Sequence, residues 1–152
     1  MTTRPWQVVA LATLCFIQAL HLFEHVLSSV LAASNHSNVV ELAENGIGGD
    51  DANAVYQHLS LSQDVFGLMA VVVLMFGVLL YRNQYLPGVR LTGTIYAVVG
   101  LIGQIVLTGS TDEGSIGAVD NTFSVLFTAL LLAGFVSLFF GKSAKWVNEH
   151  RN

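Results

Sequence analysis

Four long apolar runs divide this sequence, and they constrain its fold more than any other feature. The runs cover approximately residues 6–33, 65–81, 91–108 and 123–140. A helix of about 20 apolar residues crosses the ~30 Å hydrocarbon core of a lipid bilayer. The sequence therefore predicts an all-α integral membrane protein, a bundle of four transmembrane helices.

The charges of the connecting segments predict how these helices are oriented. All six Lys and Arg residues precede the first run, separate the second from the third, or follow the fourth: Arg4, Arg82, Arg90, Lys142, Lys145 and Arg151. The other two connections carry only acidic charges: Glu41, Glu44, Asp50, Asp51, Asp64, Asp112, Glu113 and Asp120. Because Lys and Arg gather in cytoplasmic loops, we expect both termini to lie in the cytoplasm.

Composition agrees with a membrane location and excludes several function classes. Hydrophobic residues make up 53% of the 152 residues and charged residues 11%, too few for the surface of a soluble protein of this size. We expect one membrane domain over residues 1–152, in a plasma membrane or a bacterial inner membrane, with the lipid bilayer as a partner. A net charge of −4 without a basic cluster argues against nucleic-acid binding. The lone Cys15 provides no disulfide and no cysteine-based zinc site.

The first run also has features of a secretory signal peptide, namely one Arg before a long apolar stretch. Its length of about 28 residues, and the His, Glu and His in its last third, are atypical of such peptides. We therefore expect this segment to be retained as the first span.

The connection between the first two runs contains signals for two helix ends. Residues 38–44 have the pattern of a short outer amphipathic helix ending at Asn45-Gly46, between the first two spans. Asp50 or Asp51 is placed to cap a helix that continues into the second span.

The cytoplasmic connections carry two further signals. In the short link Arg82–Arg90 between the second and third spans, Pro87-Gly88 predicts a turn. After Gly141 we expect a short helix at the inner surface, with Trp146 facing lipid as part of an aromatic belt.

Small residues recur at a spacing of four in the third and fourth runs, at Gly93 and Ala97 and at Ala129 and Ala133. Such pairs let helix backbones approach closely in lipid, either within the bundle or in a dimer. Packing within the bundle is the favoured interpretation, because four spans must pack on one another in any case.

A polar stripe on the first run is the candidate functional site. Gln18, His21, His25 and Ser28 share one helical face, and Glu24 lies at its edge. With a rise of ~1.5 Å per residue from Trp6, His21 is expected about 22 Å above the inner edge, in the outer leaflet. Ionisable residues at such depth are costly and usually face an interior, a partner or a cavity.

The chemistry of this stripe favours a transition metal. Two His residues four apart point at one ion, and together with the carboxylate of Glu24 they suit Zn²⁺ or Cu²⁺. Haem and chlorophyll are less favoured, because both His residues lie on one side of one helix. Gln18, His58, Asp64 and Gln104 are possible supporting groups at similar heights. The alternative is a hydrogen-bonded network without metal.

Three function classes remain open from the sequence. The first is a metal or cofactor site in a small membrane protein, either alone or within a larger membrane complex. The second is a non-catalytic structural subunit that docks through this stripe, on other membrane subunits or on copies of itself. The third is an oligomeric proton-coupled transporter of small solutes, with Glu24 as proton carrier. An enzyme acting as an isolated chain is disfavoured, since no nucleophile–base pair or phosphate loop is evident.

Overall fold

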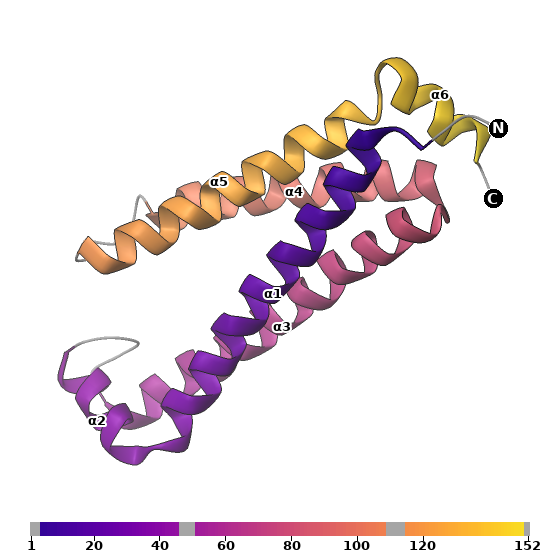
Figure 1. Cartoon of the computed structure of the whole chain (residues 1–152). Helices are drawn as coiled ribbons and strands as arrows, with labels where there is room; N and C mark the ends of the chain where they lie inside the picture. Colours follow the sequence, from indigo (N-terminus) through magenta and orange to yellow (C-terminus); the bar gives the residue numbers. More distant parts are fainter. Residues whose placement is uncertain (1–3, 46–50, 109–114, 151–152) are drawn as a thin grey trace. The chain divides into compact units, whose positions relative to one another are not determined.

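The computed structural model describes residues 4–45, 51–108 and 115–150, with side chains throughout except at residue 62 and over residues 104–123. These residues form helices joined by turns, without a β-strand (Figure 1). The helices are α1 (Trp6–Ser34), α2 (His36–Glu44), α3 (Ala52–Arg82), α4 (Leu86–Thr108), α5 (Ser115–Ser137) and α6 (Gly141–Glu149). The all-helical prediction is thereby confirmed.

Three helical segments in this part of the chain are long and apolar enough to cross a membrane: Trp6–Ser34, Ala52–Arg82 and Leu86–Gly103. A fourth is obtained if Ser124–Ser137 and Gly141–Glu149 are counted as one span, but these two segments are bent by 69°. Spans were predicted at the first three of these places and over residues 123–140, whereas residues after Gly141 were predicted to form a separate helix.

The chain divides into two compact units, which are described separately. Unit 1 contains Met1–Phe16 and Met75–Asn152, and unit 2 contains Ile17–Leu74. Both α1 and α3 therefore contribute residues to each unit. The single domain over residues 1–152 stays a prediction.

The core of unit 1 is built around Phe135 of α5, whose side chain is fully buried. The ring meets Phe76 of α3 edge to face, with centroids 5.6 Å apart. It also lies against Gly93 of α4, where an added Cβ would overlap three ring carbons. Because Ala97 is fully buried as well, the pair on α4 packs within unit 1, as the favoured interpretation holds.

The second pair of small residues behaves differently. Ala133 of α5 is exposed, whereas its neighbour Gly134 lies against α1, where an added Cβ would come within 2.7 Å of Leu11 Cδ1. The close approach on α5 therefore uses a glycine that the four-residue spacing did not select.

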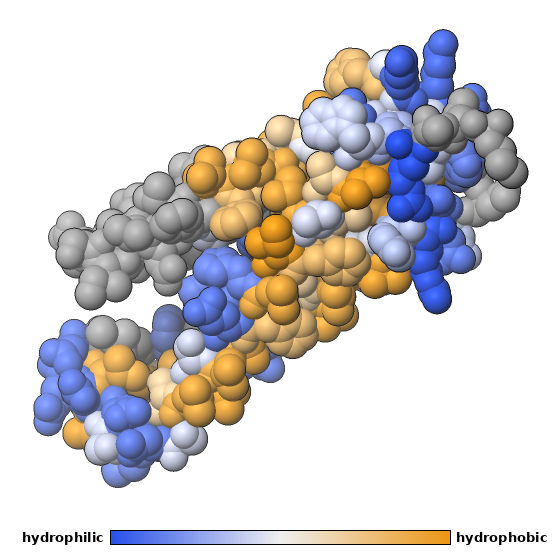
Figure 2. All heavy atoms as spheres, viewed as in Figure 1, coloured by the Kyte–Doolittle hydropathy of each residue, from blue (hydrophilic) through white to orange (hydrophobic). Residues whose placement is uncertain are grey.

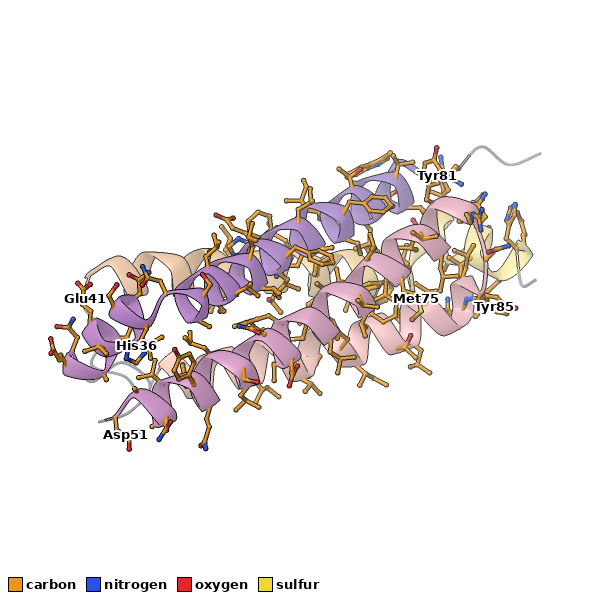
Figure 3. All side chains as sticks on the ribbon, turned by 90° about the horizontal axis from the view of Figure 1, so that it is seen from below. His36, Glu41, Asp51, Met75, Tyr81 and Tyr85 are labelled. Carbon is orange, nitrogen blue, oxygen red and sulfur yellow. The ribbon has the colours of Figure 1, made fainter. Side chains whose placement is uncertain are left out.

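Side-chain caps fix the helix ends of unit 2. The Asn35 carboxamide oxygen accepts from the backbone N–H of Ser37 at 3.1 Å, so α2 begins at His36, two residues before the predicted start. At its end, the Asn45 amide donates to the Glu41 carbonyl at 2.8 Å. Asp51 accepts from the Ala54 N–H at 2.8 Å and confirms the predicted cap of α3. Figure 3 shows His36 and Glu41 on α2 and Asp51 at the start of α3.

The turn between α3 and α4 lies before the predicted position. Asn83, in the left-handed conformation (φ 58°), closes α3 together with Gln84, whose N–H donates to the Leu79 carbonyl at 2.9 Å. Helices commonly end with one residue in this left-handed conformation, which is usually glycine and sometimes asparagine. Pro87 and Gly88 instead lie in the first turn of α4. Proline is tolerated there because that N–H needs no partner inside the helix, so the turn predicted at Pro87-Gly88 is wrong.

Hydrophilic residues gather at one end of unit 1, and the surface next to them is largely hydrophobic (Figure 2). Arg4 joins three elements at this end. Its Nη2 donates to the Tyr81 carbonyl at 2.7 Å and to the Asn83 side chain, and its guanidinium lies 6.0 Å from the centre of the Trp146 ring. Tyr81 and Tyr85 lie at this same end (Figure 3).

The short helix expected after Gly141 is present as α6, but its orientation differs from the prediction. Trp146 is only 3% exposed, and its ring packs on His150 with centroids 4.6 Å apart. The expectation that Trp146 faces lipid is therefore wrong. The side chain packs inside unit 1 because α6 turns back towards Arg4 instead of continuing α5.

Candidate functional site

The two histidines of α1 lie in direct contact within unit 2. His21 Nε2 and His25 Nε2 are 3.3 Å apart, and the two rings meet edge to face with centroids 4.7 Å apart. A spacing of four residues on a helix brings side chains onto one face. The expectation that both imidazoles point at one place is met by this geometry.

The separation of the two nitrogens matches a metal-binding geometry. In a tetrahedral site with Zn–N distances of about 2.0–2.1 Å, two ligand nitrogens lie about 3.3 Å apart. The same distance also suits a long N–H···N hydrogen bond between two neutral imidazoles. Either way the pair is arranged so that one small electrophile, a proton or a metal ion, can lie between the two nitrogens.

Glu24 approaches the opposite side of His21. Its Oε2 lies 3.9 Å from His21 Nδ1, so the carboxylate faces the nitrogen that does not contact His25. A carboxylate on this side favours the tautomer with the proton on Nδ1 and the lone pair on Nε2, as in carboxylate–histidine–metal arrangements. Glu24 is thus placed to orient the His21 ring. Its carboxylate lies on the Nδ1 side of that ring, away from the point where the two Nε2 atoms meet.

An aromatic residue of α3 supports the second histidine. The Phe66 ring stacks on the His25 ring, with centroids 5.2 Å apart and planes inclined by 25°. One residue further along α3, Gly67 lies next to Val26 of α1, since an added Cβ would be 3.9 Å from Val26 Cγ2. Phe66 therefore restricts rotation of the His25 ring from one side. No sequence pattern marks this contact, because Phe66 is one of many apolar residues in the second run.

Two of the predicted supporting residues on the other helices can be placed in the structure. His58 and Asp64 are exposed on α3, and in the part of the chain that the structure describes no three His, Cys, Asp or Glu side chains are placed to hold a metal ion. The side chain of Gln104 lies outside the described residues. Among the described side chains the pair thus offers two ligands. A metal bound there would take others from water, from residues outside the described part of the chain, or from a second chain.

Gln18 has a different environment, one turn before His21. Its side chain is 2% exposed, and its Oε1 is the buried side-chain atom that lacks a hydrogen-bond partner among the described residues. Leaving a buried acceptor unpaired costs about 1–3 kcal/mol. Such an atom fits a position where a further hydrogen-bond donor binds, within the polar stripe.

An exposed stripe on α1 was missed by the sequence analysis. The side chain of Glu24 is 77% exposed. It lies in one row with three exposed leucines, Leu20, Leu27 and Leu31. Together the four residues have the 4–3–4 spacing typical of a face that packs against another helix. A carboxylate in such an apolar row is costly to leave against lipid. The spacing was visible in the sequence, but which face of α1 is covered was not.

Comparison with known proteins adds no functional assignment to this geometry. No protein-family model, no curated protein and no solved structure matches the chain. What the site does must therefore be argued from its own residues.

Proposed function

We propose that this chain is a four-span integral membrane protein, with both termini in the cytoplasm, whose His21–His25 pair binds Zn²⁺ or Cu²⁺ in the outer leaflet as part of a larger membrane assembly. The observation that carries the metal proposal is the 3.3 Å separation of the two Nε2 atoms. Neutral imidazole is a preferred ligand of both ions. Haem or chlorophyll is a weaker candidate, because one helix presents both nitrogens to the same side.

The membrane part of the proposal is supported by charge and length together. Several helices are long enough to span a bilayer. The segment before α1, the end of α3, the start of α4 and α6 meet at one end of unit 1. These elements carry the described basic residues, which are Arg4, Arg82, Arg90, Lys142 and Lys145. Clustering of Lys and Arg is typical of the cytoplasmic side.

Cysteine labelling tests this topology. In a Cys15→Ser background, single cysteines at Gly48 and Gly114, in the two acidic connections, are expected to react with a membrane-impermeant maleimide in intact cells. A cysteine at Gly88, in the exposed first turn of α4, is expected to react only after permeabilisation, because the basic end remains inside. Labelling of Gly88 in intact cells would reverse the orientation.

The assembly part of the proposal rests on the two ligands that the described side chains provide and on Glu24. Two imidazoles leave a tetrahedral ion with two open positions. The carboxylate is largely exposed among leucines, where lipid solvates it poorly. A neighbouring subunit or a second copy of the chain that covers this row would shield Glu24 and is placed to complete the coordination.

The same row supports a second candidate function, a structural subunit without metal. In that case the polar stripe and the leucines Leu20, Leu27 and Leu31 form a docking face for a partner helix, and the histidine pair contributes hydrogen bonds. The two candidates differ in one measurable property, the metal content of the purified assembly.

Metal analysis of matched double variants tests the proposal. The protein is purified in mild detergent, equilibrated with buffered zinc or copper, and examined by elemental analysis. Loss of supporting contacts alone costs about 10–100-fold in metal affinity, so His21→Ala/His25→Ala is expected to lower affinity by at least that factor. Binding is also expected to weaken on acidification, since each imidazole must be deprotonated to ligate.

The control removes two other histidines from unit 2, with His36→Ala/His58→Ala, both exposed in the structure. This variant is expected to keep the wild-type metal content. Equal metal in wild type and in His21→Ala/His25→Ala contradicts the metal proposal. A metal-free wild type that co-purifies with stoichiometric partner chains favours the structural subunit instead.

A further inference from the structure

A pocket of about 1200 Å³ opens at the basic end of unit 1. Its walls come from the segment before α1, the first residues of α1, the end of α5 and one side of α6. It is lined by groups from both ends of the sequence, and it lies entirely within unit 1. The polar stripe of α1 contributes nothing to it.

The charges of this pocket favour an anion. Arg4, Lys142 and Lys145 line it together with a single carboxylate, Glu149. The hydrogen bonds of Arg4 use Nη2 alone, whereas a guanidinium has five N–H donors. In the described structure Nη1 and Nε therefore remain able to donate to a ligand while Nη2 holds the end of α3.

Uncapped backbone donors face the same region. The helix α6 begins at Gly141, and its N-cap residue, Phe140, makes no side-chain capping bond. The first N–H groups of a helix have no partner within the helix and carry a partial positive charge. The residues that bear them, Gly141, Lys142 and Ser143, are all part of the pocket lining.

The hydroxyl of Ser143 supplies an independent observation. The residue lines the pocket although it is only 2% exposed. Across the described residues the structure records no hydrogen bond to its Oγ. A hydroxyl held in a buried residue at the pocket wall can therefore donate to, or accept from, a ligand that enters the pocket.

We propose that this pocket binds an anionic phosphate group. Three cationic side chains, the start of a helix and a hydroxyl form the usual equipment of a phosphate site. Two sources present this chemistry, inorganic phosphate in solution and the phosphodiester of an anionic phospholipid. The lipid is well matched by the exposed rings of Trp6 and Phe140 in the lining, and that source rests on the proposed membrane location, whereas phosphate binding itself does not.

The two tryptophans of the chain give a direct readout, because both line the pocket. The full chain, in a maltoside detergent without phosphate, is titrated with short-chain phosphatidylglycerol, with short-chain phosphatidylcholine and with inorganic phosphate. We expect a saturable fluorescence change with phosphatidylglycerol and a much weaker response to the zwitterionic lipid. Competition by inorganic phosphate assigns the binding to the phosphate itself, and its absence assigns it to the lipid headgroup.

Matched single-charge variants test the assignment to this pocket. A Lys near an anionic headgroup contributes about 1 kcal/mol, so Lys142→Gln and Lys145→Gln are each expected to weaken binding about fivefold. Arg82→Gln removes one charge at the same end but outside the lining, and it is expected to change affinity less than about twofold. Ser143→Ala is expected to weaken binding without altering the net charge. Equal responses to the two lipids, or Lys variants that bind like wild type, overturn the proposal.

Discussion

Replacing Trp146 by alanine is expected to lower the free energy of unfolding by about 3–5 kcal/mol, the usual cost of deleting a buried aromatic side chain. The indole is 3% exposed and contacts both Arg4 and His150. Its loss leaves a cavity between α6 and the start of α1. Reversible unfolding in mixed detergent micelles, followed by circular dichroism, measures the change.

Trp6→Ala is the matched control for this experiment. It removes the same side chain from the same end of unit 1, but from a position that is 73% exposed. Exposed substitutions of this kind usually change stability by no more than about 0.5 kcal/mol. If both variants lose the same stability, or neither does, Trp146 is not a core residue and the original expectation that it faces lipid regains support.

Placing a larger residue at Gly93 is expected to have an effect of similar size. The fully buried ring of Phe135 occupies the space that a Cβ would fill, so Gly93→Leu forces α4 away from α5. Overpacking of this kind typically costs about 1–3 kcal/mol and sometimes more. We expect a loss of about 3 kcal/mol, measured in the same unfolding experiment.

Gly103→Leu, on the same helix, is the control, because an added Cβ there meets no described side chain or backbone within 4 Å. Its stability is expected to stay close to that of wild type. A second variant, Gly93→Ala/Phe135→Leu, is expected to be more stable than Gly93→Ala alone, since the smaller side chain yields space to the new methyl group. A Gly93→Leu protein as stable as Gly103→Leu contradicts the packing described for unit 1.

Helix positions could be predicted where local chemistry decides them. The Asp51 cap depends only on a carboxylate placed before three free N–H groups. The turn after α3 could not be predicted from Pro87-Gly88, because proline fits the first helical turn as well as a loop. The actual turn uses Asn83 in the left-handed conformation, and its side chain is fixed by Arg4, which lies far away in the sequence.

The orientation of short helices could not be predicted from the sequence either, because it also depends on contacts with distant residues. A nine-residue helix such as α6 has an apolar side in either environment, so Trp146 suited lipid and protein equally well. Its burial results from contacts with the other end of the chain. Tertiary contacts of this range leave no periodic signal.

The contact between the two histidines of the candidate site could be predicted from the sequence, but the positions of the residues around them could not. The spacing of His21 and His25 determines that they meet, because four residues return a helix to the same face. The side of His21 that Glu24 approaches depends on rotamers, which a helical projection does not contain. The stacking of Phe66 on His25 depends on how α3 lies beside α1 in unit 2, and the pairing of two uniformly apolar helices has no residue-specific code.

The position of Arg4 has a consequence for the order in which the protein matures. Arg4 leaves the ribosome long before its ring partner Trp146, because α1 to α5 are all synthesised in between. Domains generally form from the N-terminal side as the chain is made, but this junction stays open until α6 has been synthesised. A chain that stops before α6 lacks this closure, a difference by which cellular quality control can separate unfinished from finished copies.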